Sequence, residues 1–153
     1  MSDAPLLEVR QVKKYFPIRE GVLQREVARV HAVDDVSLSV REGETLGLVG
    51  ESGCGKSTLG RTIVRLYEPT AGEIIFQGTH IEKLRARRLR PLRREMQMVF
   101  QDPYASLNPR KRVGTIISDP MRIHHLGDRN DRRTRVGELL ETVGLSPEHY
   151  NRF

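Results

Sequence analysis

The sequence contains one cysteine, no tryptophan and no long apolar run. A single cysteine excludes an internal disulfide framework and fits a reducing compartment. No segment approaches the ~18 consecutive apolar residues that a membrane-spanning helix needs. The first residues also lack the basic flank and the apolar stretch of a signal peptide. These absences predict a soluble protein that stays in the cytoplasm.

The composition is nevertheless sufficient for a folded core. Hydrophobic residues make up 37% of the 153-residue chain, and 13 further residues are glycine. This share is usual for a globular protein and excludes wholesale disorder. The length fits a single domain or an unfinished one.

Hydrophobic periodicity predicts an α/β order of elements. Strands are expected at 6–15, 30–40, 45–49, 73–76 and 96–100, the third as a short apolar strand buried on both faces. Helices are expected at 56–67, at 113–125 with an interruption at Asp119 and Pro120, at 132–143, and from Pro91 onward. Asp131 is the expected N-cap of the last helix and Gly144 its C-terminal stop. Residues 16–29 are interpreted as a loop or a hairpin insertion.

The net charge of +6 comes from one local run. Seven basic residues and no acidic one lie within 83–94, namely Lys83, Arg85, Arg87, Arg88, Arg90, Arg93 and Arg94. Nucleic-acid binding is one interpretation of such a run. No aromatic side chain is interleaved to stack on bases, and no helix-turn-helix or zinc spacing accompanies it. We therefore expect a solvated or partner-facing surface and no nucleic-acid partner.

One motif carries chemistry. Residues 50–57 match G-x-x-x-x-G-K-[ST], the P-loop, and read Gly50, Glu51, Ser52, Gly53, Cys54, Gly55, Lys56 and Ser57. The glycines allow positive φ, so successive N–H groups can form an anion nest at a helix N-terminus. Lys56 supplies a point charge for the β- and γ-phosphates, the Ser57 hydroxyl is placed for Mg²⁺, and Thr58 could reach the α-phosphate. Cys54 is interpreted as a tolerated small residue rather than a nucleophile, because no His–acid pair can be assigned to it.

A P-loop enzyme also needs groups around the metal and the attacking water. Asp102 is one candidate metal ligand, but Gln97 and Gln101 break the apolar strand that should precede it. Gln101 is polar and directly follows the expected strand, so it is the better candidate for the group near the metal and the attacking water.

The P-loop together with the segment Val-Phe-Gln-Asp-Pro-Tyr-Ala-Ser-Leu-Asn-Pro-Arg at 99–110 resembles the nucleotide-binding subunit of ATP-binding cassette (ABC) transporters. Within that family the chain looks like the oligopeptide and dipeptide importer group, which includes nickel importers. The resemblance implies ATP and Mg²⁺ as ligands, with Gln101 in the Q-loop and Tyr15, or less well Phe16, stacking on adenine. The alternative role for Tyr15 is packing on the sheet.

The resemblance also implies an assembly on the cytoplasmic face of a membrane. Its partners would be membrane permease subunits, a second identical or different ATP-binding subunit and, indirectly, a solute-binding protein. Residues 1–100 would form the N-terminal β-rich part and the P-loop core, and residues 101–153 the Q-loop and the start of a helical subdomain. The segment 102–125, with Tyr104, Leu107 and Met121 beside three basic residues, would meet the permease.

Departures from the family pattern are equally informative. The Leu-Ser-Gly-Gly-Gln signature, the second acidic motif with its catalytic glutamate and the switch histidine are absent from these 153 residues. The sequence therefore predicts an ABC ATPase truncated after its first half, which binds Mg·ATP weakly and does not hydrolyse it. A non-enzymatic nucleotide-binding remnant is the alternative, and a basic nucleic-acid-binding module is a third, weaker interpretation.

Overall fold

The computed structural model describes residues 4–22, 24–102 and 106–153. The chain falls into two compact units, Met1–Gln97 and Met98–Phe153. Among the described residues, no helix is both long and apolar enough to cross a membrane.

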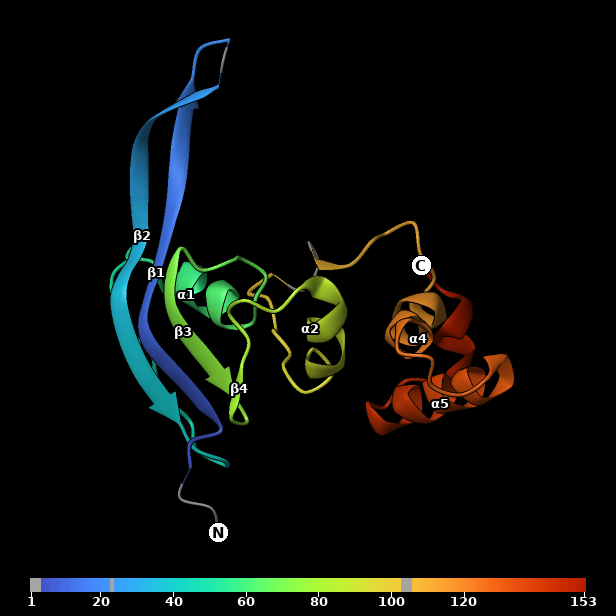
Figure 1. The fold of residues 1–153 in the computed structure, drawn as a ribbon. Coiled ribbons are helices and arrows are strands. Elements are labelled where there is room, and N and C mark those ends of the chain that lie inside the picture. The colour runs from blue at the N-terminus through green and yellow to red at the C-terminus, as the bar shows by residue number, and fades with distance from the viewer. Residues whose placement is uncertain (1–3, 23, 103–105) are drawn as a thin grey trace. The chain divides into compact units, whose positions relative to one another are not determined.

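The first unit is built on a four-stranded antiparallel sheet with the order β2-β1-β3-β4 (Figure 1). The strands are β1 (Leu7–Glu20), β2 (Arg25–Val40), β3 (Ala71–Phe76) and β4 (Thr79–His80). The expected strands at 6–15, 30–40 and 73–76 are confirmed. Residues 16–29 form the distal half of the β1–β2 hairpin, so the hairpin interpretation is correct and the loop interpretation is wrong.

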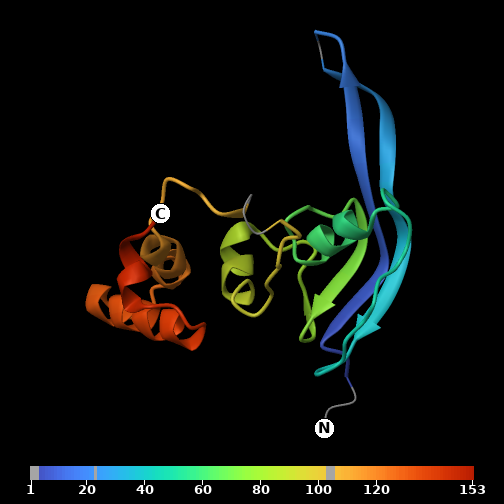
Figure 2. The same ribbon diagram turned by 180° about the vertical axis from the view of Figure 1, so that it is seen from behind.

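The core of this unit lies where β1 and β3 pair. Val9, Val12 and Ile74 are almost completely buried, and Phe76, Ile81 and Leu89 complete the cluster. The described hairpin residues 17–22 and 24–31 are exposed, and the hairpin extends past the rest of the unit (Figures 1 and 2). The sheet is therefore anchored at the base of the hairpin.

Two helices complete the first unit. Helix α1 (Lys56–Ile63) ends before the predicted residue 67, because Arg65 adopts a left-handed φ of 56° and Leu66 is left exposed. Helix α2 (Ala86–Leu92) begins upstream of Pro91 and contains it near its end, so the prediction that Pro91 opens the helix is wrong. Leu89 is buried and Leu92 packs against the core, which fixes the helix around these apolar residues.

Two predicted strands do not form. Residues 45–49 and 96–100 are irregular, and Val49 and Val99 are almost fully exposed. A strand requires a neighbour for its backbone hydrogen bonds, and no described strand pairs with either segment. Both segments are apolar in sequence, but neither forms the strand that was predicted from this character.

The second unit is helical. It contains α4 (Val113–Ile123), α5 (Arg129–Thr142) and the 3₁₀ helix η1 (Pro147–Asn151). Helix α4 runs through Pro120 without the predicted interruption. Val136 and Leu140 of α5 are buried, and the ring of Tyr150 lies directly against Gly114 of α4.

The boundaries of α5 differ from the prediction at one end only. Asp128, not Asp131, is the N-cap, and its carboxylate accepts hydrogen bonds from the N–H groups of Asn130 and Asp131. Asp131 reciprocates by accepting from the N–H of Asp128, which completes a capping box. At the other end Gly144, with a φ of 76°, terminates the helix as predicted.

Candidate functional site

The glycine-rich turn between residues 50 and 55 curls through three left-handed glycines. The φ angles are 155° at Gly50, 85° at Gly53 and 97° at Gly55. Only glycine adopts such angles without strain. The sequence prediction of a tight turn immediately before a helix is thus met, because Gly55 is the N-cap of α1.

The turn is held against the sheet at one point. A Cβ on Gly55 would lie 2.1 Å from the carbonyl oxygen of Ala32 in β2, so the backbones are in direct contact. Leu59, one turn into α1, is buried, and Thr62 is completely buried with its hydroxyl donating to the Thr58 carbonyl. These contacts fix the direction in which the N-terminus of α1 points.

Lys56 folds back over the turn. Its Nζ donates to the carbonyl oxygens of Gly50 at 2.8 Å and Glu51 at 2.6 Å, and lies 3.4 Å from Cys54 Sγ. A Cβ on Gly50 would lie 2.8 Å from the same sulfur. The ammonium is therefore held inside the turn by backbone oxygens, while Cys54 fills the space beside Gly50 as a small side chain.

The N-terminus of α1 is suited to an anion. No side chain among the described residues caps it, and its first turn contains no acidic residue. The unbonded N–H groups and the helix dipole both favour negative charge there. Glu51, Ser52 and Ser57 are exposed around this end, and Thr58 is half-buried.

A cavity of about 340 Å³ opens beside this end of α1. Cys54, Gly55 and Lys56 line it from the turn, and His31 and Asp34 line it from β2. Its remaining lining is apolar and comes from Ala32, Val33, Val36, Leu48, Val49 and Leu59. A cavity of this size, lined by the Lys56 ammonium, the Asp34 carboxylate, His31 and several apolar side chains, is large enough for a small organic ligand.

Tyr15 is joined to β2 through its ring and its hydroxyl. It stands opposite His31 in the strand register, and the two rings stack with centroids 3.9 Å apart. The Tyr15 hydroxyl donates to Asp34 Oδ1 at 2.5 Å, and Lys13 Nζ lies 3.5 Å from the same oxygen. Phe16 is engaged elsewhere, edge-on against Tyr67 at 5.4 Å.

These contacts shift two pKa values in opposite directions. The hydrogen bond from Tyr15, with a smaller contribution from the Lys13 charge, lowers the pKa of Asp34 below its ordinary value. The same hydrogen bond raises the pKa of the Tyr15 hydroxyl. At neutral pH the pair is therefore a phenol donating to a carboxylate.

His31 and Asp34 were missed by the sequence analysis, although both line the cavity. The signal that could have found them is the hairpin itself. Once strands 6–15 and 30–40 are paired antiparallel through a connecting turn, residues near 31 must face residues near 15.

Gln101 and Asp102 lie in the second unit, where both are exposed. Gln101 follows an irregular segment rather than the strand that was predicted to present it. Tyr104 lies outside the described residues. The roles assigned to these residues stay predictions.

Among the described residues, no group of three His, Cys, Asp or Glu side chains could hold a metal ion. The Ser57 hydroxyl is an oxygen ligand of the kind that a hard cation such as Mg²⁺ prefers, and phosphate oxygens of a bound nucleotide would supply further ligands.

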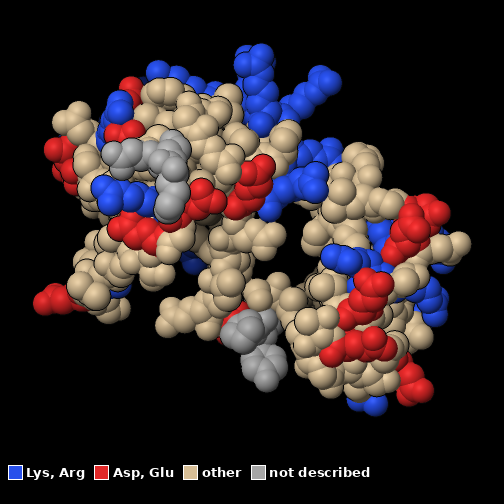
Figure 3. Space-filling view, turned by 90° about the horizontal axis from the view of Figure 1, so that it is seen from below, with Lys and Arg blue, Asp and Glu red and all other residues tan. Residues whose placement is uncertain are grey.

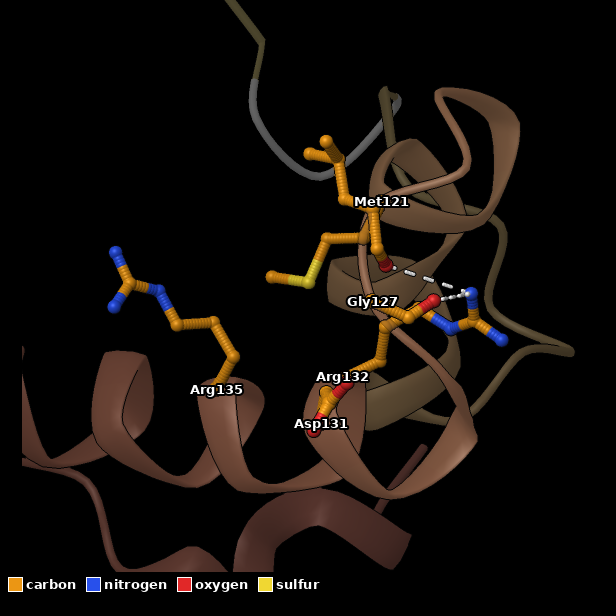
Figure 4. Close-up of a pocket in the computed structure, with 6 residues that line it drawn as sticks. Met121, Gly127, Asp131, Arg132 and Arg135 are labelled. Atoms are coloured by element: carbon orange, nitrogen blue, oxygen red, sulfur yellow. Dashed lines mark hydrogen bonds between the residues drawn. The ribbon is translucent and has the colours of Figure 1, made fainter.

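The second unit has a separate cavity of about 280 Å³ at the α4–α5 corner (Figure 4). Met121 and Leu126 form its apolar wall, and Arg132 and Arg135 reach it from α5. Arg132 Nη1 donates to the Gly127 carbonyl at 2.9 Å, so this guanidinium is fixed in place.

The left-handed glycine turn, the inward-folded lysine and the uncapped helix N-terminus define a P-loop nucleotide-binding fold. The chain belongs to the ABC transporter family, because the family model "ABC transporter" matches residues 33–153.

Relatives of known function agree with this assignment. The chain is 55% identical to the "Oligopeptide transport ATP-binding protein AppF" of Bacillus subtilis (strain 168), over 99% of this chain and 46% of that protein. It is 52% identical to the "Glutathione import ATP-binding protein GsiA" of Escherichia coli (strain K12), over 100% of this chain and 25% of that protein. The chain thus spans about half or less of the length of these relatives.

Solved structures show the same fold. The dimeric post-hydrolysis state of the ATP-binding cassette MJ0796 bound to ADP and Pi matches with a TM-score of 0.74 at 25% identity. The match covers 95% of this chain and 60% of that one. The resemblance to an ABC ATP-binding subunit and the α/β P-loop fold class predicted from the sequence are confirmed.

Proposed function

We propose that this chain is the nucleotide-binding part of an ABC importer ATPase, which couples ATP binding and hydrolysis to uptake of oligopeptides, dipeptides or a related solute. The observation that carries the proposal is the P-loop, in which Lys56 Nζ is held by the carbonyls of Gly50 and Glu51 at the uncapped N-terminus of α1. AppF is named for oligopeptide transport and GsiA for glutathione import, and both names support peptides or related compounds as the solute.

The roles of the P-loop residues follow from their positions. Backbone N–H groups of residues 50–58 would cradle the phosphates, and Lys56 would exchange its carbonyl partners for β- and γ-phosphate oxygens. The hydroxyl of Ser57 would hold Mg²⁺, which neutralises phosphate charge when bound. Tyr15 would lie beneath the adenine, braced by His31 and Asp34. Gln101 would act near the metal and the attacking water.

The proposal also assigns a role to each part of the chain. Residues 1–100 would supply the N-terminal β-rich part and the P-loop core, and residues 101–153 the Q-loop and the start of a helical subdomain. A second ATP-binding subunit would complete the catalytic site, as the dimeric cassette structures suggest. Membrane permease subunits would hold this pair at the cytoplasmic face, with a solute-binding protein acting indirectly.

Nucleotide binding and turnover can be tested separately. We expect a fluorescent ATP analogue to bind the chain weakly and Lys56→Ala to weaken binding at least about tenfold, because the P-loop charge for the phosphates is lost. We expect no phosphate release above background, since the signature loop and the general base are absent from the sequence. Binding unaffected by Lys56→Ala would refute the P-loop assignment, and steady turnover abolished by it would refute the inactivity of this chain.

The alternative function is that of a nucleotide-binding remnant with no transport role. It shares every residue of the P-loop, so nucleotide binding does not separate the two. Co-purification with a permease separates the two functions, because only an importer subunit requires that partner.

The segment 102–125 is the proposed permease contact. Leu107 and Arg110 are exposed there, and Met121 lines the α4–α5 cavity beside Arg135 (Figure 4). An apolar wall with a basic rim suits a partner segment that carries an apolar side chain next to a carboxylate. Crosslinks from Leu107→Cys to a permease would support this surface, and crosslinks confined to residues 6–40 would refute it.

A further inference from the structure

The basic run that the proposed function leaves unexplained spans α2 and the residues at its two ends, since α2 itself contains only three of the seven basic residues. Leu89 is buried in the core and Leu92 packs against it, so this face of the helix is closed to partners. The basic residues away from this face are exposed, and Figure 3 shows Lys and Arg side chains that extend from the surface into solvent. We define the α2 basic surface as Lys83, Arg85, Arg87, Arg88 and Arg94.

Nothing in the described part of the chain neutralises this surface. Its five cations make no ion pair or side-chain hydrogen bond with a described residue. Arg93, which is also exposed, differs from these five because its Nη2 donates to the Arg65 carbonyl at 3.2 Å. The surface is thus distinct from the basic residues that hold the fold together.

The two acidic residues that flank the run in the sequence, Glu82 and Glu95, make contacts with other residues. Glu82 is almost buried, accepts from the Ile74 N–H and pairs with His80 at 3.4 Å. Glu95 accepts from Gln77 Nε2 at 2.8 Å. Like charges three and four positions apart on one helix repel each other, and the first turn of α2 holds no acidic residue to offset its dipole. An anionic partner would relieve this repulsion.

The side-chain types select among anionic partners. Arginine binds phosphate through paired N–H donors, so a phosphate-bearing surface fits four arginines better than scattered carboxylates do. No aromatic residue lies between 77 and 99, which leaves no platform for nucleic-acid bases. A membrane presents a continuous layer of phosphates and needs no such platform.

We propose that the α2 basic surface binds anionic phospholipid headgroups and holds the subunit against the membrane independently of its permease. The choice of a membrane rests on the proposed importer function, whereas the charge and exposure of the surface do not. Each basic side chain near an anionic membrane adds to the electrostatic attraction, so a few suffice for measurable binding.

The test is co-sedimentation of the full chain with vesicles at low salt. We expect binding to vesicles containing phosphatidylglycerol, little binding to pure phosphatidylcholine, and loss of binding as salt shortens the screening length. The triple variant Arg87→Gln, Arg88→Gln and Arg94→Gln should lower the partition coefficient at least about tenfold. The matched control, with the same loss of charge at exposed positions, is Arg25→Gln, Arg41→Gln and Arg129→Gln, and should bind nearly as the parent does.

Three outcomes would overturn the proposal. The α2 variant could bind vesicles like the parent, or the control could lose binding equally, which would leave only net charge. Binding of a short RNA that the α2 variant loses, without vesicle binding, would assign the surface to nucleic acid instead. Circular dichroism of each variant checks folding. Lys56→Ala should keep full vesicle binding, so failure of the nucleotide site is distinguishable from failure of this surface.

Discussion

At the scale of single residues, the glycine at the junction of turn and helix should be irreplaceable. Gly55→Ala adds strain at a φ of 97° and a Cβ 2.1 Å from the Ala32 carbonyl oxygen. Strain and overpacking together should lower the free energy of unfolding by about 2–5 kcal/mol. Gly53→Ala is the control, because its φ is also positive but nothing lies within 4 Å of the new Cβ. Urea unfolding of both variants measures the difference, and equal losses would contradict the close contact with β2.

A second residue-scale prediction concerns the Tyr15–Asp34 hydrogen bond. Because the folded pKa of Asp34 is lowered, its contribution to stability is present above the unfolded pKa and is lost as the pH falls through the folded pKa. The pKa of Tyr15 is raised, so its contribution is present below the unfolded pKa and is lost as the pH rises through the folded pKa. Tyr15→Phe should move the pKa of Asp34 up toward its ordinary value of 3.8. NMR titration of the Asp34 carboxyl carbon gives the answer, and an unchanged pKa would show that the hydrogen bond is not formed.

At the scale of elements, the N-cap of α5 distinguishes the structure from the sequence-based expectation. Asp128→Ala removes two hydrogen bonds to N–H groups of the first turn, whereas Asp131→Ala removes one bond that runs in the reverse direction. Loss of an N-cap costs about 0.5–2 kcal/mol, so Asp128→Ala should destabilise the second unit more than Asp131→Ala. Thermal unfolding followed by circular dichroism compares them. The reverse order would restore Asp131 as the cap.

The distal hairpin is a further element whose contribution can be isolated. Replacing residues 18–28 by Asn-Gly would join Pro17 to Arg29, which already face each other in the register. The described residues of the removed segment are exposed, and the core residues Val9 and Val12 lie outside it. We expect the unfolding free energy to change by less than about 1 kcal/mol, because an isolated two-stranded ribbon is at best marginally stable in water. A large loss in urea unfolding would mean that the arm supports the core.

The elements also show how far sequence reasoning reaches. Spacing alone located the P-loop, because glycines, a lysine and a hydroxyl at fixed positions determine local backbone chemistry. It failed at 45–49 and 96–100, where apolar composition indicated strands that find no hydrogen-bonding neighbour among the described residues. It also missed His31 and Asp34, whose place beside Tyr15 arises from strand pairing across 16 residues or more rather than from any local pattern.

At the scale of the molecule, each unit has its own core. Ile74 belongs to the apolar cluster of the first unit, and Leu140 is buried in the second unit. Truncating either to alanine should cost about 2–5 kcal/mol in its own unit. We therefore expect Ile74→Ala to accelerate hydrogen exchange in the first unit alone and Leu140→Ala in the second alone, measured by mass spectrometry of peptides. Acceleration throughout the chain by either variant would show that the two units unfold as one.

The contact that closes the second unit has a practical consequence. The Val113 N–H donates to the Arg152 carbonyl at 2.8 Å, and Tyr150 covers Gly114 at the same place. The two ends of the 40-residue helical segment therefore meet at a single point. A segment with adjoining ends can be inserted into a surface loop of an unrelated host protein without stretching the host's backbone. Residues 113–152 could therefore be transferred as one piece, together with the α4–α5 cavity.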